Sequence, residues 1–178
     1  MIVKEEKLEQ ARLVFADTQV NVTSSGQKHL GAVIGNSDYQ TVFVNKLVDE
    51  WVEQIKQLSE IALFEPHAAY SAFTSCIRHK YTYFLRTIPQ ISTLLEPLES
   101  AIRNLLIPAL SNGRSVTDDE RLLLSLPVRL GGMGIVLTTR DADRDHEFSK
   151  KATSVLTNAI IEQRVGLPEG FLSKKAKS

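Results

Sequence analysis

The side chains of this sequence that could support catalysis include acids gathered in two short runs. Three consecutive acids span Asp118–Glu120, and acids alternate with other residues from Asp141 to Asp145. A bound metal ion needs several oxygen ligands around one point, and neither run lies on the glycine-turned loop that would arrange them. Acids at the start of a helix interact favourably with its dipole. We therefore interpret both runs as helix starts and expect no metal or other cofactor in this chain.

The sequence also lacks the spaced motifs of common enzyme classes. It has no phosphate-binding loop, dinucleotide fingerprint, CxxC pair, HExxH or GxSxG. The four histidines stand in separate segments, which argues against a zinc site. The single cysteine, Cys76, lies in an apolar helical stretch, so we expect it to be buried as a small hydrophobic residue. Gly131, Gly132 and Gly134 are spaced too tightly for a dinucleotide site and predict a turn against the core.

Basic residues beside aromatic ones form the second group of candidates. Lys28 and His29 are adjacent, Arg78 and Lys80 flank a histidine, and Arg86 follows two helical turns after Arg78. Such groups could contact a phosphate backbone, but solvated helix and hairpin faces carry similar residues. The formal net charge is zero, with 21 basic and 21 acidic residues, whereas nucleic-acid-binding domains are usually basic. Any binding to nucleic acid is therefore expected to be weak and independent of sequence.

Length and composition fit an ordinary globular domain. The chain has 178 residues, of which 43% are hydrophobic and 24% charged, so a core can form. No apolar run approaches the ~20 residues needed to span a bilayer, and the first residues do not form a signal peptide. We expect a soluble intracellular protein with no membrane contact, and the sequence does not decide between nucleus and cytoplasm.

Hydrophobic periodicity predicts the elements that must position these groups. Apolar residues at helical spacing indicate a short helix over Val3–Phe15. Two β-prone runs, Gln19–Thr23 and His29–Ile34, flank a turn signal at Ser24–Gly26 and predict a β-hairpin. From Tyr39 onward the period becomes that of amphipathic helices.

Five helices are predicted in this second part of the chain. They run from Tyr39 to Pro66, over His67–Arg86, from a capping box at Thr93–Glu96, from a second box at Thr117–Glu120, and over Asp141–Gln163. Ser37 or Asp38 is expected to cap the first of them. The shared core should contain Trp51, Leu58, Phe73, Phe84, Leu98 and Leu105. The last helix should use Phe148, Ala152, Val155, Leu156 and Ile160 for packing.

The predicted fold is therefore mainly α. Residues 1–36 should form an N-terminal helix and a small β-hairpin, residues 37–163 a helical bundle, and residues 164–178 a flexible basic tail. A hairpin alone is marginally stable in water, so it needs a surface to pack on.

The order of these segments resembles the post-palm and thumb region of reverse transcriptases from non-LTR-type retrotransposons. The stretch Gly26–Gly35 is similar to a strand that follows the palm in this family, with His29 where an aromatic residue is common. The long helix with Trp51 and the runs Tyr83–Pro89 and Leu126–Ile135 follow in the family's order. The resemblance covers the chain up to its basic tail.

This resemblance implies a thumb-like bundle that lies against a template–primer duplex of RNA or DNA and contacts its backbone. The residues that would make these contacts are Lys28, His29, Gly31, Arg78, Lys80 and Arg86. Glycines such as Gly31 and Gly35 would allow close approach of the hairpin backbone to the primer end, although a bulge or a strand end explains them equally well.

The resemblance also implies that this chain lacks the catalytic residues of the family. In the family, the palm supplies an aspartate pair that binds two Mg²⁺ ions for phosphoryl transfer. Asp118 and Asp119 cannot take that role, because a leucine-rich helix follows them and no palm strand precedes them. We expect a fragment that is inactive as a polymerase alone, with the palm and fingers half as a partner and Mg²⁺ a cofactor of the intact parent enzyme only.

A helical protein-interaction or scaffold module with no nucleic-acid role is the alternative. A neutral bundle with a basic tail fits both functions, and the charge distribution separates them. Convergence of Lys28, Arg78, Lys80, Arg86 and Arg129 on one face would favour duplex contact. Acids interspersed among these residues would favour the scaffold.

Overall fold

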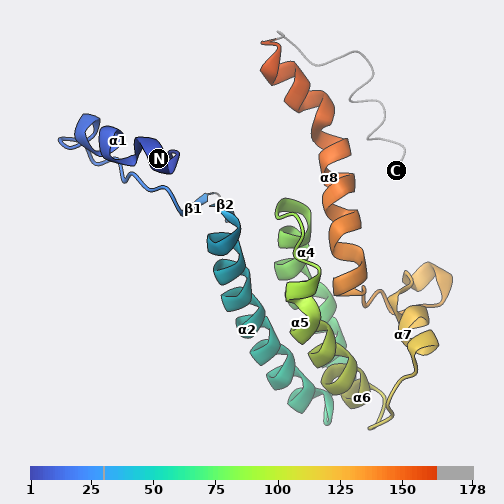
Figure 1. Cartoon of the computed structure of the whole chain (residues 1–178). Coiled ribbons are helices and arrows are strands. Elements are labelled where there is room, and N and C mark those ends of the chain that lie inside the picture. Colours follow the sequence, from blue (N-terminus) through green and yellow to red (C-terminus); the bar gives the residue numbers. More distant parts are fainter. Residues whose placement is uncertain (30, 164–178) are drawn as a thin grey trace.

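A computed structural model describes residues 1–29 and 31–163, and it confirms the mainly helical fold. Within these residues the only sheet is one antiparallel strand pair, and helices make up most of the rest. Figure 1 shows a short N-terminal helix that stands apart, a hairpin, a bundle of long helices and a last helix that projects from it. The predicted basic tail, residues 164–178, lies outside the described residues.

The N-terminal segment forms one 3-10 turn, η1 (Glu5–Lys7), and one short helix, α1 (Leu8–Val14). Neither element contains a buried residue. The strand predicted over Gln19–Thr23 was wrong, because Thr23 makes only an isolated parallel bridge to Ile2.

The hairpin itself is present, but its turn lies elsewhere than predicted. Strand β1 (Gly26–His29) pairs with β2 (Ala32–Gly35), so the connection between the strands includes Gly31 and does not lie at Ser24–Gly26. Gly31 has a φ of +85°, a left-handed conformation that favours glycine and closes a tight turn. The alternation at Gln19–Thr23 was therefore a misleading signal, and the Gly31 turn sets the register.

Helix α2 (Ser37–Ala62) is the longest element and presents one apolar stripe to the bundle. Its N-cap is Asn36, whose side chain accepts a hydrogen bond from the Tyr39 N–H, so the predicted cap at Ser37 or Asp38 was off by one or two residues. The buried apolar residues of α2 recur at helical spacing: Val44, Val48, Trp51, Ile55, Leu58 and Ala62.

Two further long helices pack on α2, and each contains one wide π turn. The first consists of α3 (Pro66–Ala72), the π turn η2 (Phe73–Ile77) and α4 (Arg78–Thr87). The second consists of the 3-10 turn η3 (Thr93–Leu95), α5 (Glu96–Ala101), the π turn η4 (Ile102–Leu106) and α6 (Ile107–Leu110). The predicted capping box at Thr93–Glu96 was wrong, because no side-chain cap forms there and the segment opens with the 3-10 turn.

The π turn at η4 explains why one predicted core residue is misplaced. Pro108 has no N–H to donate to the Asn104 carbonyl, and a π turn widens the helix just before it. The extra residue rotates the following face, so Leu106 is fully buried and Leu105 is 40% exposed. Trp51, Leu58, Phe73 and Leu98 are buried as predicted, and Phe84 packs half-buried against them.

The prediction that Cys76 is buried was also wrong. It lies in the π turn η2, where Phe73 and Ile77 point into the core and Cys76 is exposed.

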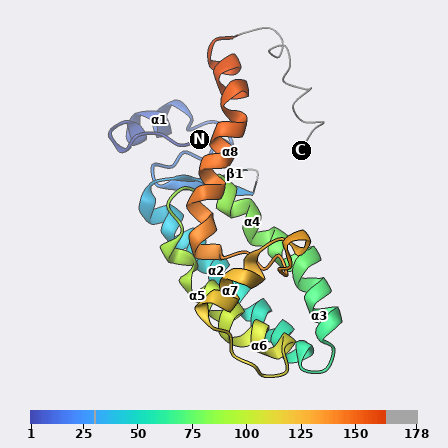
Figure 2. The same cartoon turned by 90° about the vertical axis from the view of Figure 1, so that its right-hand side faces the viewer.

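The last part of the chain runs through α7 (Asp118–Ser125), the 3-10 turn η5 (Val128–Leu130) and α8 (Thr138–Ile161). The second predicted capping box is confirmed, with Thr117 and Glu120 bonding each other's backbone N–H groups. Helix α8 packs on α4 and α5 near its start, and its second half projects beyond the bundle in both views (Figures 1 and 2). Phe148, Val155 and Ile160 are consequently exposed rather than in the core. Of the described helices, none is both long and apolar enough to cross a membrane.

Candidate nucleic-acid interface

Helix α4 places several basic residues on the side that faces α8. The two helices enclose a groove of about 460 Å³, lined by Arg78, His79, Thr82, Tyr83, Arg86, Val136 and Asp145. Residues four apart on a helix share a face, so the sequence spacing itself brings the two arginines into one groove. The Thr82 side chain stands between them, and its hydroxyl donates to the Arg78 carbonyl at 2.7 Å.

The two arginines of this groove differ in the hydrogen bonds that their guanidinium groups already make. Arg78 is half-buried, and its guanidinium donates to the Gly134 carbonyl at 3.3 Å. Arg86 is exposed, and its side chain has no hydrogen bond or ion pair within the described part of the chain. Arg86 is therefore the cation in the groove that is most available to a ligand.

Lys80 does not join this groove. Its ammonium group donates to the Gln54 side chain on α2 at 2.9 Å, on a different side of α4. The sequence placed Lys80 with Arg78 because they are two residues apart, but such residues do not share a helix face.

The hairpin turn approaches α4 at Tyr83, one of the residues that line the groove. A Cβ on Gly31 would lie 3.7 Å from the Tyr83 ring, which places the hairpin turn beside the groove. Lys28 and His29 are exposed on β1, directly before the turn. The packing surface that the hairpin required is thus supplied by α4 and by the start of α2.

One acidic residue lines the groove together with the cations. Asp145 lines the groove, 27% exposed, and its carboxylate is 3.7 Å from the Arg144 guanidinium. Arg129 lies on η5, outside the groove. The structure therefore brings Arg78 and Arg86 together near the hairpin turn, and it separates them from Lys80 and Arg129.

The sequence did not predict the most extensive polar contact of the molecule, which joins α5, α7 and the start of α8. Arg121 is 2% exposed and binds the Glu99 carboxylate through two nitrogens, at 2.7 and 3.0 Å. Glu99 also accepts from the backbone N–H and the hydroxyl of Thr138, both at 3.1 Å. A buried arginine needs such partners, but nothing in the local pattern of α7 distinguishes Arg121 from an exposed residue.

Side chains also hold the glycine-rich turn, where four successive carbonyls each accept a hydrogen bond. Tyr70 donates to Met133, Arg78 to Gly134, and Arg121 to both Ile135 and Val136. The predicted turn is present, with positive φ at Gly131 and Gly134, and a Cβ on Gly132 would clash with the Leu126 carbonyl at the exposed end of α7 rather than with the core. Arg78 thus supports the turn on one side and faces the groove on the other.

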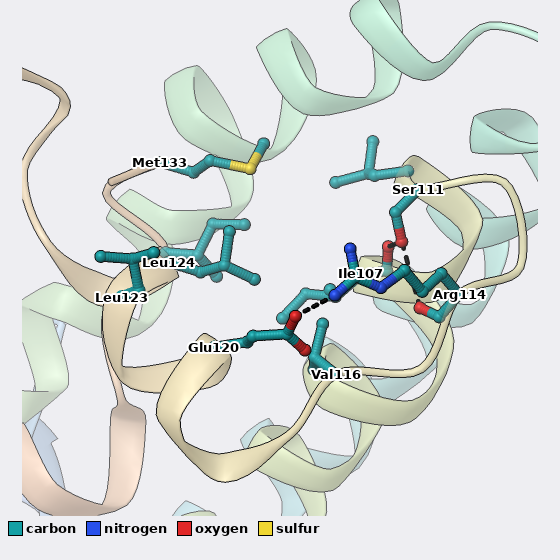
Figure 3. A pocket seen from close by; sticks show the side chains of 10 residues that line it. Ile107, Ser111, Arg114, Val116, Glu120, Leu123, Leu124 and Met133 are labelled. Carbon is teal, nitrogen blue, oxygen red and sulfur yellow. Dashed lines mark hydrogen bonds and ion pairs between the residues drawn. The ribbon is translucent and has the colours of Figure 1, made fainter. Parts of the chain in front are cut away.

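A second hollow, of about 260 Å³, lies between α6 and α7 (Figure 3). Its walls are mainly apolar, and Arg114 pairs with Glu120 at one side. The backbone N–H of Thr117, together with the Arg114 guanidinium, lowers the pKa of Glu120 below its ordinary value. Ser111 donates to backbone carbonyls, so the polar groups of this hollow already bond one another or the backbone. We find no reactive constellation in it.

No group of three or more metal-ligating side chains gathers anywhere in residues 1–29 and 31–163. Comparison with protein-family models, with curated proteins and with solved structures gave no match for this chain.

Proposed function

We propose that this chain is a thumb-like part of a non-LTR-type retrotransposon reverse transcriptase that contacts the backbone of a template–primer duplex. The observation that carries the proposal is the shared position of Arg78 and Arg86 in one groove between α4 and α8. Eight residues of helix separate them by about 12 Å along the axis, a span that covers several phosphates of a duplex. Contacts of this kind position a duplex without reading its sequence.

The hairpin supports the same assignment. Its turn lies beside Tyr83 at the groove, and Lys28 and His29 are exposed next to it. A duplex in the groove would therefore meet the hairpin backbone at Gly31, where the absence of a side chain permits close approach.

Catalysis is not part of this proposal. The family's Tyr-x-Asp-Asp turn has no counterpart in the sequence, and Asp118 and Asp119 form the first turn of α7. We expect no nucleotide incorporation when the chain is given primer, template and Mg²⁺. Primer extension above a no-protein control, abolished by a substitution within this chain, would contradict this expectation. A polymerase would need the palm and fingers as a partner.

Salt dependence of duplex binding tests the proposed contact. The affinity should lie in the non-specific range, ~10⁻⁴–10⁻⁶ M at physiological salt, and should fall steeply as salt rises. Because each phosphate contact contributes about 0.9 to the slope of log K against log salt, Arg86→Ala should flatten that slope by about one unit.

Lys80→Ala is the matched control, because it removes the same charge from the other side of α4. Arg78→Ala should also flatten the slope, but a thermal melt must accompany it because Arg78 supports the glycine-rich turn. Absence of binding at low salt, or equal slopes for Arg86→Ala and the wild type, would overturn the proposal.

A protein-interaction module is the second candidate, and two observations favour it. Lys80 and Arg129 lie apart from Arg78 and Arg86, and Asp145 lines the same groove as these two arginines. Five large apolar side chains are exposed within nine residues around α7 and η5: Leu122, Leu123, Leu126, Val128 and Leu130. Exposed apolar patches commonly mark protein–protein contacts. If the salt titration shows no duplex binding, this candidate takes precedence.

A further inference from the structure

Another groove lies at the C-terminal end of α2, which is the end away from the hairpin. It has no role in the proposed duplex contact. It has a volume of about 500 Å³ and runs between the C-terminal half of α2 and the α5–α6 helix. The lining residues are Lys56, Ser59, Glu60, Leu63, Asn104, Leu105, Pro108, Ala109 and Gly113. None of them lines the groove between α4 and α8.

Apolar side chains at this groove are open to solvent. Leu63 is 65% exposed and Leu105 is 40% exposed. Phe64, the next residue after Leu63, is 84% exposed, the highest value among the large apolar side chains described. An apolar surface of this kind is commonly covered by a partner in the functional assembly.

The charges at the groove are compatible with a second copy of this chain as the partner. Among the described residues, the charged ones that line it are Lys56 and Glu60, which are exposed, opposite in sign and one helical turn apart. A two-fold axis that crosses α2 between them would place Lys56 of each copy opposite Glu60 of the other. An isologous interface requires this kind of self-complementary surface.

We propose that this groove is the interface of a homodimer, in which two α2 helices pack antiparallel and each Lys56 pairs with Glu60 of the second copy. Leu63 and Leu105 supply the apolar area, and the two ion pairs fix the orientation. Within one chain Lys56 lies 3.7 Å from Glu53, but both side chains are more than half exposed. Such a surface pair is weak, so it does not prevent Lys56 from turning to a second copy.

Sedimentation velocity over a micromolar to millimolar range tests the dimer. The wild type should shift from monomer to dimer as its concentration rises. Lys56→Glu and Glu60→Lys should each weaken the dimer about tenfold or more, because each brings like charges together. Mixing the two variants should restore association, since one then offers only acids at these positions and the other only lysines.

Lys46→Glu and Glu50→Lys are the matched controls, since they change an exposed pair of the same spacing on α2 that does not line the groove. They should leave the dimer unchanged, and circular dichroism should show all four variants folded. Leu63→Asp tests the apolar contact separately and should also give monomers. A wild type that stays monomeric throughout, or variants that fail to associate when mixed, would overturn the proposal, and the groove would then belong to a different partner.

Discussion

Two regions of this molecule are held together by different kinds of contact. The bundle, residues 37–110, is packed by apolar side chains that recur at helical spacing, with many of them fully buried. In the strap, residues 111–137, only Arg121 and Ile135 are fully buried, and its apolar side chains Val116, Leu124, Met133 and Val136 pack half-buried against the core. Polar contacts add to this packing through Arg121, Glu99 and the hydrogen bonds to four successive carbonyls.

This difference determines how each region should respond to substitution. Apolar packing distributes stabilisation over many small contacts, so a single truncation removes a limited share. A buried polar network stabilises only when every member has its partner, and removal of one member leaves the others buried and unpaired. The strap should therefore be more sensitive to one polar substitution than the bundle is to one apolar truncation.

The largest expected effect is at Arg121. Arg121→Ala would leave the Glu99 carboxylate buried without its cation and free the Ile135 and Val136 carbonyls. The free energy of unfolding should fall by about 3–5 kcal/mol in a denaturant melt. Arg129→Ala, which removes an exposed arginine from the same strap, should change it by less than about 0.5 kcal/mol. Equal effects of the two variants would show that the polar contacts do not hold the strap.

Leu98 gives the corresponding measurement for the bundle. It is fully buried, so Leu98→Ala should lower the free energy of unfolding by about 2–5 kcal/mol. Leu105→Ala is the control and should cost less, because the π turn leaves Leu105 40% exposed. If both truncations cost the same, the register change at the π turn is wrong.

The bundle and the strap also differ in how much of their structure the sequence predicts. The apolar period predicted the helices of the bundle and most of its core, because burial of an amphipathic face is a local pattern. It misplaced Leu105 and Cys76, since a π turn shifts the phase of the helix that the period assumes fixed. It missed Arg121 and Glu99 altogether, because a contact between residues 22 apart leaves no periodic trace.

In the candidate site, too, local spacing was informative and the packing of distant segments was not predictable. Of the basic residues named from the sequence, Arg78 and Arg86 line one groove, as their spacing of eight residues on a helix allows. The sequence could not show that Lys80 reaches α2 or that Arg78 also supports the strap, because both facts depend on how distant segments pack.

The capping box of the strap should have an intermediate effect. Thr117 accepts a hydrogen bond from the Glu120 N–H at the start of α7. Thr117→Ala should lower the free energy of unfolding by about 1 kcal/mol. Hydrogen exchange should show the loss confined to α7 amides, while exchange of α2 amides stays unchanged. Equal acceleration in both helices would mean that the strap does not open separately from the bundle.

The smallest effect is expected at a polar atom in the bundle core. The Tyr81 hydroxyl is buried and has no hydrogen-bond partner among the described residues, and burial raises its pKa well above the ordinary value of 10.0. Because only the neutral form suits the core, stability should be complete below pH 10.0 and should decline as the pH rises above it.

Tyr81→Phe removes the unpaired hydroxyl, so stability at pH 7 should stay the same or rise by up to about 1 kcal/mol. The alkaline decline in the denaturant midpoint should become shallower in this variant. A loss of more than about 1 kcal/mol at pH 7 would mean that the hydroxyl has a bonding role in the core.

The groove between α4 and α8 joins the two regions, because Arg78 belongs to the bundle and its guanidinium also holds the strap. A duplex titration followed by backbone amide chemical shifts tests directly whether this groove is the binding surface. At low salt, we expect shifts in His79, Tyr83 and Arg86, extending to Lys28 and His29 on the hairpin, with α7 and η5 unaffected. Shifts centred on Leu122–Leu130, or no shifts at all, would contradict it.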